Sequence, residues 1–384
     1  MEGLCWALPE HIVINILSYL SREDRARAGS TCTTWHRCYK SPMLWHVSTL
    51  NFQRPKDGHC LQWLQQYAQH IRVLRILVNQ REEQNRQNAC EALKILCHTE
   101  GRKLTSLRIN FTETNPLFYA GQEFIDVLKT LFGCRMESQK IQFRHVDLSG
   151  LSVAYDDSVF EILSLNNPQL ETLNVLNGNL VCKISPECVE NIAQRCRCLT
   201  ELRLFHCSLS DGVLYALAEA DRKPLKHLSL LCRREQKYTQ DLSSEAWSEL
   251  VKKSPQLRVV LGFDHTCPLR MVAGILKPEI PVVDLRLETF TYIYDEVNLA
   301  AVLYYKTLEK VVLQTRNSPE LGDALIKLCT RSERLTCLMV YCVLEKRVVD
   351  TILAVRPEMK EKGTYILKWK QEPEPWTVGV EEGD

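Results

Sequence analysis

The stretch LTELRLFHC, residues 199–207, places apolar side chains at Leu199, Leu202 and Leu204. Alternate residues of a β-strand point to opposite faces, so this order predicts a short strand with one buried face. The same order, apolar-x-x-apolar-x-apolar, has ten matches along the chain. They are Ile71-Leu74-Ile76, Leu104-Leu107-Ile109, Phe143-Val146-Leu148, Leu170-Leu173-Val175, Leu199-Leu202-Leu204, Leu225-Leu228-Leu230, Leu257-Val260, Val282-Leu285-Leu287, Leu308-Val311-Leu313 and Leu335-Leu338-Val340, the seventh weaker because Gly262 takes its third position.

The matches recur regularly after two longer first gaps, with central residues at 74, 107, 146, 173, 202, 228, 260, 285, 311 and 338. Most gaps fall in or near the roughly 20–29 residues of leucine-rich repeats. Apolar residues at helical spacing, such as Val189, Ile192 and Ala193, lie between the strands. Each strand-plus-helix unit is too small to bury its own apolar face, but stacked units bury these faces together. The pattern predicts an α/β solenoid over residues 49–370, of about ten to eleven repeats. Its parallel strands would line the concave face and its helices the convex face, with a last strand at Tyr365–Trp369.

A different α/β architecture also alternates strands and helices. Ten matches that recur along the chain argue against a run of unrelated units. No glycine-rich phosphate loop follows any of the predicted strands, which argues against a nucleotide-binding domain.

Charge and hydropathy exclude other classes of protein. Lys and Arg number 48 and Asp and Glu 47, so the net charge of +1 provides no strong field for nucleic acid or anionic membrane. No apolar run approaches the roughly 18 residues of a membrane helix. The opening MEGLCWALPE lacks the basic and small-residue features of a secretory leader. We therefore expect a cytoplasmic and/or nuclear protein with no nucleic-acid or membrane partner.

The 17 cysteines are numerous for such a protein. None forms a CxxC pair, and their spacing to each other and to histidines does not match a zinc site, so we expect no metal and no cofactor. Thiols in a reducing compartment act as small core residues. Cys207 has the position that leucine-rich repeats often give to Asn or Cys. A cysteine enzyme is the rival class, but the neighbours His206 and Cys207 would point to opposite faces of a strand.

The first 45 residues do not belong to the repeat. Ile12, Ile16, Leu17 and Leu20 define one face of a helix that begins after Leu8-Pro9. Ser21 is a candidate N-cap for a second helix, and Pro42 interrupts the chain before Leu44-Trp45. Three short helices bury little apolar surface alone. The pattern predicts a helical module with an apolar surface for a partner.

These residues resemble the F-box. The matching positions are Leu8, Pro9, Ile12, Ile16, Leu17, Ser18, Tyr19, Leu20, Ser21, Asp24, Cys32, Trp35, Leu44 and Trp45. Arg25 stands where the family usually has Leu, and Thr31 where it usually has Val. Followed by the repeats, an F-box module over residues 1–48 resembles the F-box/leucine-rich-repeat family across nearly the whole chain.

This resemblance implies the substrate-recognition subunit of an SCF (Skp1-cullin-F-box) E3 ubiquitin-protein ligase complex. The F-box would dock on Skp1, which connects to the cullin and RING subunits, while the repeats bind a protein substrate for ubiquitination and degradation. The protein itself would be a non-catalytic adaptor. The alternative is a repeat scaffold or inhibitor that binds a partner without promoting its ubiquitination.

Two sets of binding residues follow. The Skp1-binding set is Leu8, Pro9, Ile12, Ile16, Leu17, Leu20, Trp35, Leu44 and Trp45. The alternative for its helix residues is an ordinary core, and both tryptophans could equally pack inside the module or against the first repeat. The candidate substrate-binding residues are strand arginines expected on the concave face, namely Arg75, Arg108, Arg203 and Arg286. They would favour an acidic or phosphorylated segment, and the alternative is a solvated strand face.

The C-terminal tail, residues 371–384, alternates acidic residues and proline before Trp376. We expect it to be extended and partly disordered at its end, with Trp376 folding back as a cap on the last repeat.

Overall fold

The computed structural model describes residues 8–114, 121–134, 143–178, 184–234 and 241–369. The predicted tail over residues 371–384 lies outside this part of the chain. The chain forms two compact units, Met1–Ile184 with Arg195–Cys198, and Ser185–Gln194 with Leu199–Asp384. In the described part, no helix is both long and apolar enough to cross a bilayer.

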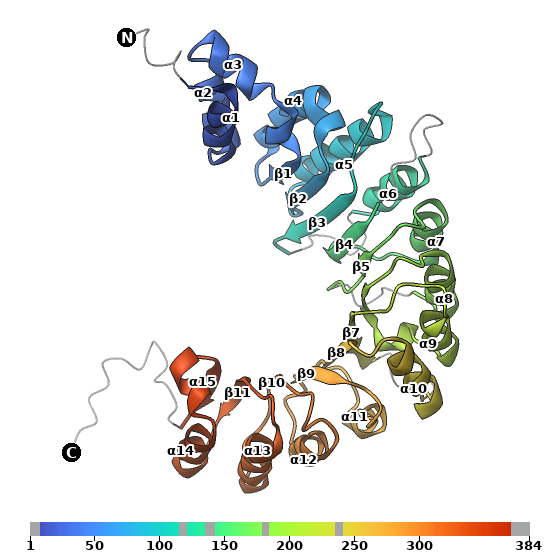
Figure 1. Ribbon diagram of the computed structural model, residues 1–384, viewed down its shortest axis with the longest axis vertical. Coiled ribbons are helices and arrows are strands. Elements are labelled where there is room, and N and C mark those ends of the chain that lie inside the picture. Colours follow the sequence, from blue (N-terminus) through green and yellow to red (C-terminus); the bar gives the residue numbers. More distant parts are fainter. Residues whose placement is uncertain (1–7, 115–120, 135–142, 179–183, 235–240, 370–384) are drawn as a thin grey trace, which may run out of the picture. The chain divides into compact units, whose positions relative to one another are not determined.

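The first unit opens with the helical module and continues with strand-and-helix repeats (Figure 1). The module contains α1 (Glu10–Ser18), α2 (Arg22–Gly29), α3 (Thr33–Tyr39) and the 3-10 helix η1 (Pro42–Trp45). The repeats contain β1 (Val47–Phe52), η2 (Pro55–His59), α4 (Cys60–Tyr67), η3 (Ala68–His70), β2 (Val73–Asn79), α5 (Glu83–His98), β3 (Ser106–Thr112), α6 (Glu123–Gly133), β4 (His145–Gly150), α7 (Asp157–Asn166) and β5 (Thr172–Asn174).

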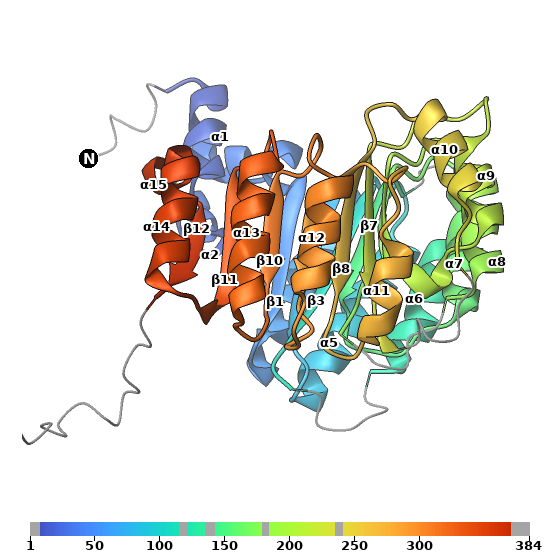
Figure 2. The same ribbon diagram turned by 90° about the horizontal axis from the view of Figure 1, so that it is seen from below.

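The second unit repeats the same plan. Its elements are α8 (Pro186–Arg195, whose last residue belongs to the first unit), β6 (Glu201–Phe205), η4 (His206–Ser208), α9 (Asp211–Ala218), β7 (His227–Cys232), α10 (Ser244–Lys253), β8 (Arg258–Phe263), α11 (Leu269–Ile275), β9 (Val282–Leu287), α12 (Tyr294–Leu303), β10 (Lys310–Leu313), α13 (Pro319–Arg331), β11 (Cys337–Val343), α14 (Lys346–Val355), α15 (Pro357–Lys362) and β12 (Tyr365–Lys368). In Figure 2, α12, α13 and α14 lie side by side along one face of this unit's strands.

All strand pairs within each unit are parallel and follow the order of the chain, as expected for a solenoid. The central residues of successive repeats lie beside each other, as Leu74 does with Leu107 and Val311 with Leu338. Every residue of nine of the ten predicted triplets is buried, with at most 2% of its surface exposed. The predicted solenoid of parallel strands and helices is therefore confirmed, and its core is the stacked apolar rows.

The repeat at β8 corrects one prediction. Val260 is wrong as the central inward residue, because Val259 pairs with Leu228 of β7 and is fully buried, while Val260 is only half-buried. The inward row continues through Leu261 and Phe263. A shift of one residue exchanges the two faces of a strand. The adjacent valines made both registers equally apolar by sequence.

The first strand, β1, was not predicted. Its central position holds Ser48, which is buried although polar. The Ser48 hydroxyl donates a hydrogen bond of 3.0 Å to the Trp45 carbonyl oxygen, which satisfies it without water. Leu50 and Phe52 on the same face are fully buried and extend the apolar rows.

Candidate functional site: the helical module and the strand face

The helices of the module share a core of buried side chains. Val13 and Leu17 of α1 are fully buried, and they pack in one cluster with Cys38, Leu44 and Trp45. Ser21 caps α2, since its hydroxyl oxygen accepts a hydrogen bond of 3.1 Å from the Asp24 backbone N–H, as predicted. Contacts between the helices thus hold the module, and Ile12 and Ile16 lie outside this cluster.

The first repeat completes this core with aromatic rings. The Trp45 ring centroid lies 5.1 Å from Trp63 and 4.8 Å from Tyr67, both on α4. Tyr39 of α3 meets the same ring edge-on at 5.1 Å. Trp45 therefore packs both inside the module and against the first repeat, and Trp35 is half-buried at the edge of the cluster.

The predicted Skp1-binding set divides into two groups. Leu17, Leu44 and Trp45 lie in the core, where at most 4% of their surface is exposed, and Leu20 is half-buried against it. The other members lie on the surface: Leu8 is 40% exposed, Ile12 and Ile16 are 36% exposed, and Pro9 is also exposed. The structure thus separates residues that shape the module from residues that a partner could contact.

The exposed members form a stripe along α1. Ile12 and Ile16 are one helical turn apart, Leu8 lies just before the helix, and Tyr19, its C-cap residue, is 83% exposed. We call Leu8, Ile12, Ile16 and Tyr19 the α1 stripe. Sequence reasoning missed Tyr19 as a member of this surface, although its helical spacing from Ile12 and Ile16 could have indicated it.

Arg25, which departs from the usual F-box pattern, connects segments of the module through hydrogen bonds to their main-chain carbonyls. Its Nε donates to the carbonyl oxygens of Leu17 (2.9 Å) and Leu20 (3.0 Å), and its Nη1 to that of Leu44 (2.7 Å). Nη2 donates to the Ser18 carbonyl at 3.0 Å. These carbonyls belong to the end of α1 and to η1, where helical partners are missing. Partial burial lowers the pKa of Arg25.

The predicted strand arginines divide between the two units, two in each. In the first unit, Arg75 and Arg108 are adjacent and exposed, and Arg108 lies 3.4 Å from the Asp147 carboxylate on the next strand. In the second unit, Arg203 is exposed on β6, while Arg286 on β9 donates to Asp284 of its own strand at 2.8 Å. Arg108 and Arg286 thus already have a carboxylate partner.

Sequence reasoning missed a stronger pair at the start of the strands. Arg258, the first residue of β8, donates through Nη1 and Nη2 to the two carboxylate oxygens of Glu309, at 2.8 and 2.6 Å. This hydrogen bonding raises the pKa of Arg258 and lowers that of Glu309. Glu309 precedes β10, so the pair spans β9, and only the register of three repeats reveals the contact.

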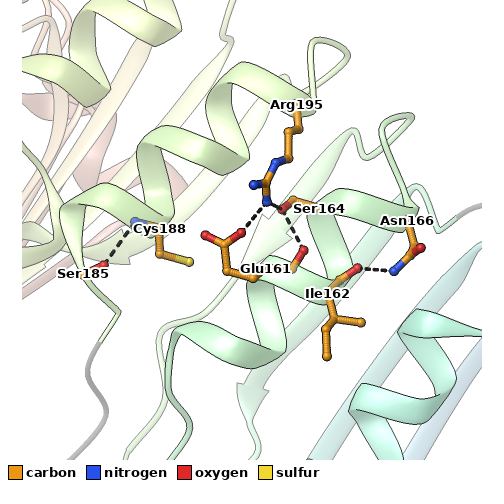
Figure 3. A network of polar contacts seen from close by, with 7 residues as sticks. All are labelled: Glu161, Ile162, Ser164, Asn166, Ser185, Cys188 and Arg195. Carbon is orange, nitrogen blue, oxygen red and sulfur yellow. Dashed lines mark hydrogen bonds and ion pairs between the residues drawn. The ribbon is translucent and has the colours of Figure 1, made fainter.

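Another polar network lies in the helix layer of the first unit (Figure 3). Arg195 is ion-paired with Glu161 of α7 and donates to the Ser164 hydroxyl at 3.1 Å. Ser164 in turn donates to the Glu161 carbonyl at 3.2 Å. These groups satisfy one another, which is typical of a structural network.

The cysteines occupy core positions. Nine of those in the described ranges are buried and six are half-buried. Burial raises the pKa of the Cys90, Cys267 and Cys329 thiols to about 12. Such thiols do not ionise at neutral pH, and a nucleophilic cysteine must do so. Among the described residues, no three His, Cys, Asp or Glu side chains gather as a metal site would require.

Known proteins resemble the chain in both parts. The F-box-like family model matches residues 5–50. Human F-box/LRR-repeat protein 8 is 32% identical over 372 residues, which cover 96% of each chain. The mouse protein of that name is 30% identical, again over 96% of each chain. Mouse F-box/LRR-repeat protein 21 is 26% identical over 267 residues, 67% of this chain and 59% of that protein. This chain therefore belongs to the F-box/LRR-repeat protein family.

Proposed function

We propose that this protein is the substrate-recognition subunit of an SCF-type E3 ubiquitin-protein ligase complex. The α1 stripe docks on Skp1, and Skp1 connects the chain to the cullin and RING subunits. The repeats hold a protein substrate for ubiquitination and degradation. The chain itself acts as a non-catalytic adaptor. Membership of the F-box/LRR-repeat family supports this role.

The α1 stripe is the observation that carries the proposal. Val13 and Leu17 fill the module's core from the same helix, so Ile12 and Ile16 remain on the surface after folding. Contiguous exposed apolar side chains of this kind mark protein interaction surfaces. A stable partner that covers them buries apolar area without any rearrangement of the module.

The test replaces the two central residues of the stripe, Ile12→Asp/Ile16→Asp, in the full-length chain. Charged side chains in an apolar interface should weaken the binding of purified Skp1 by at least about 100-fold in calorimetry, because central apolar contacts are worth about 2 kcal/mol or more. The circular dichroism spectrum and melting temperature should match those of the unmodified chain, since both side chains are exposed.

The matched control is Leu165→Asp/Val302→Asp, which changes exposed aliphatic residues in the repeats, 58% and 45% exposed. It should bind Skp1 as the unmodified chain does. Retained binding by the α1 variant, or equal loss in both variants, would contradict the proposed docking surface.

A second measurement separates the ligase role from a scaffold or inhibitor. Proteins captured by the chain in cells should have longer half-lives when the Ile12→Asp/Ile16→Asp variant replaces the unmodified chain, because a bound substrate is then detached from the ligase. If the turnover of every captured protein is unchanged while Skp1 binding is lost, the scaffold role is correct.

A further inference from the structure

A basic hollow lies at the edge of the second unit where the strands begin. Successive repeats contribute to it: Lys226 and His227 at the start of β7, Gln256 and Arg258 at the start of β8, Thr307 before β10 and Arg334 before β11. Its volume is about 490 Å³. Ligand-binding clefts have volumes of roughly 300–1,000 Å³, so this hollow can hold one or two side chains of a partner.

The charge of the hollow has one sign. Lys226, Arg258, Arg334 and His227 are among its lining residues, and none of those lining residues is acidic. The nearby Glu309 carboxylate is bonded to Arg258 through both oxygens. Arg334 lies close enough to Glu309 to lower its pKa further. Glu309 therefore offsets Arg258 fully and Arg334 in part, and among the described residues Lys226 forms no ion pair with a carboxylate.

The backbone holds this edge in place. The Arg258 backbone N–H donates to the Lys226 carbonyl at 2.9 Å. The Glu309 N–H donates to the Val283 carbonyl at 2.9 Å, and the Glu309 carbonyl accepts from the Thr336 N–H at the same distance. Lys226 and Arg258 thus stand at the start of neighbouring strands, and Arg334 precedes β11, three strands beyond β8 in the same hydrogen-bonded sheet, so little ordering of the backbone would be required on binding.

Thr307 adds a polar group that lacks a partner. Its hydroxyl oxygen is buried and has no hydrogen-bond partner in the part of the chain that the structure describes. A buried hydroxyl without a partner is unfavourable, so an acceptor that reaches it would be stabilised. An oxyanion placed among Lys226, Arg334 and Arg258 could accept a hydrogen bond from this hydroxyl as well as from the cations.

We infer that this hollow binds an acidic segment of the substrate protein, whose carboxylate or phosphate groups lie along the row of cations from Lys226 to Arg334. The inference rests on the proposed function, because it assigns the substrate's chemistry to a place in the repeats. The predicted anion-binding site was the middle of the strand face, with its strand arginines. The inferred site lies instead at the edge where the strands begin. Arg258, fixed by Glu309, orients the site rather than supplying its free charge.

The experiment measures fluorescence anisotropy of labelled peptides with the full-length chain at low salt. The probes share one sequence with a central Glu-Ser-Glu, the same with phosphoserine, and a neutral Gln-Ser-Gln version. Both acidic peptides should bind and the neutral one should not, with affinity falling as salt is added. The ratio of the two acidic affinities identifies carboxylate or phosphate as the preferred group.

Charge reversal at the hollow, Lys226→Glu/Arg334→Glu, should weaken acidic-peptide binding by about tenfold or more. The control Lys252→Glu/Arg270→Glu makes the same change in charge at exposed positions on α10 and α11, and should change it less than about twofold. If the reversal variant does not fold, Thr307→Val removes only the hydroxyl and should weaken binding about threefold.

Three results would overturn the inference: equal binding of the neutral peptide, equal binding by the Lys226→Glu/Arg334→Glu variant, or tighter binding of single-stranded oligothymidylate through the same residues. Skp1 binding is measured in parallel. If the chain binds Skp1 but does not prefer acidic peptides, the assignment of the hollow is wrong and the proposed function stands. If the chain prefers acidic peptides but does not bind Skp1, the proposed function is wrong and the assignment of the hollow stands.

Discussion

Arg25 of the module and Arg258 of the repeats use their guanidinium groups in opposite ways. In the module, Arg25 donates to main-chain carbonyls of Leu17, Leu20 and Leu44, and burial lowers its pKa. In the repeats, Arg258 donates to a carboxylate, and this raises its pKa. The ends of helices leave carbonyls without partners, and an arginine can satisfy them there, as Arg222 also does in the repeats for the Ala193 and Ala216 carbonyls. Where the stacked strands begin, the backbone is already hydrogen-bonded, and Arg258 instead pairs with a carboxylate of another repeat. The acceptors around an arginine thus decide whether it holds the fold or remains on a binding surface.

Arg25→Ala should have the largest effect on this comparison. Removing a guanidinium that serves several carbonyls should lower the free energy of unfolding of the first unit by about 2 kcal/mol, allowing for its partial exposure. Hydrogen exchange should accelerate in α1 and around η1, and should be unchanged in the second unit. The control Arg27→Ala, on the same helix with 78% of its side chain exposed, should change stability by less than about 0.5 kcal/mol. Equal effects in both variants would show that Arg25 acts only as a surface charge.

The pair of Arg258 and Glu309 should give a smaller energy. A double-mutant cycle with Arg258→Ala and Glu309→Gln should show a coupling of about 1 kcal/mol in urea unfolding, because the geometry is bidentate but both side chains are partly exposed. A coupling energy close to zero would mean that the contact between Arg258 and Glu309 does not stabilise the repeats. Arg25 would then contribute to stability and Arg258 would not.

The same pair should make stability depend on pH. Arg258 lowers the pKa of Glu309 below its ordinary value of 4.5, so the unfolded chain takes up this proton first. The stabilisation is present above the unfolded pKa and is lost as the pH falls through the folded one. The stability difference between the unmodified chain and Glu309→Gln should therefore shrink from about pH 5 downward in urea titrations. A difference that stays constant to low pH would contradict the assignment.

Arg108→Ala should have the smallest effect. Its side chain is 57% exposed, and its contact with Asp147 is 3.4 Å long. The free energy of unfolding should change by less than about 0.5 kcal/mol. A larger loss would mean that exposed strand charges stabilise the repeats as Arg25 stabilises the module.

The repeat pattern predicted the fold well because each triplet has to fill a position in the same stacked core. Prediction failed where this constraint was locally ambiguous. Ser48 hid the first strand, because a local hydrogen bond to Trp45 permits a polar residue at an inward position. Val259 and Val260 could not be distinguished, because both are apolar and only pairing with Leu228 fixes the register.

The site was less predictable than the fold. Apolar residues of the module were recognised as a group, but the division between the buried Leu17 and the exposed Ile16 depends on which side of α1 the first repeat and α3 cover. The role of Arg25 was also hidden, because its acceptors are backbone atoms that any sequence would supply. The hollow between Lys226 and Arg334 joins residues more than a hundred positions apart, and only parallel register brings them together.

The aromatic contact between Trp45, Trp63 and Tyr67 limits where the module can be separated from the repeats. A fragment that stops at residue 48 would lose two of the rings that cover Trp45 and would expose a large indole to water. A module grafted from a relative would face the same difficulty unless Trp63 and Tyr67 travelled with it. The smallest fragment that keeps this contact thus extends through α4. A substitution in the module before β1 is expected to require a matching substitution in α4 after it.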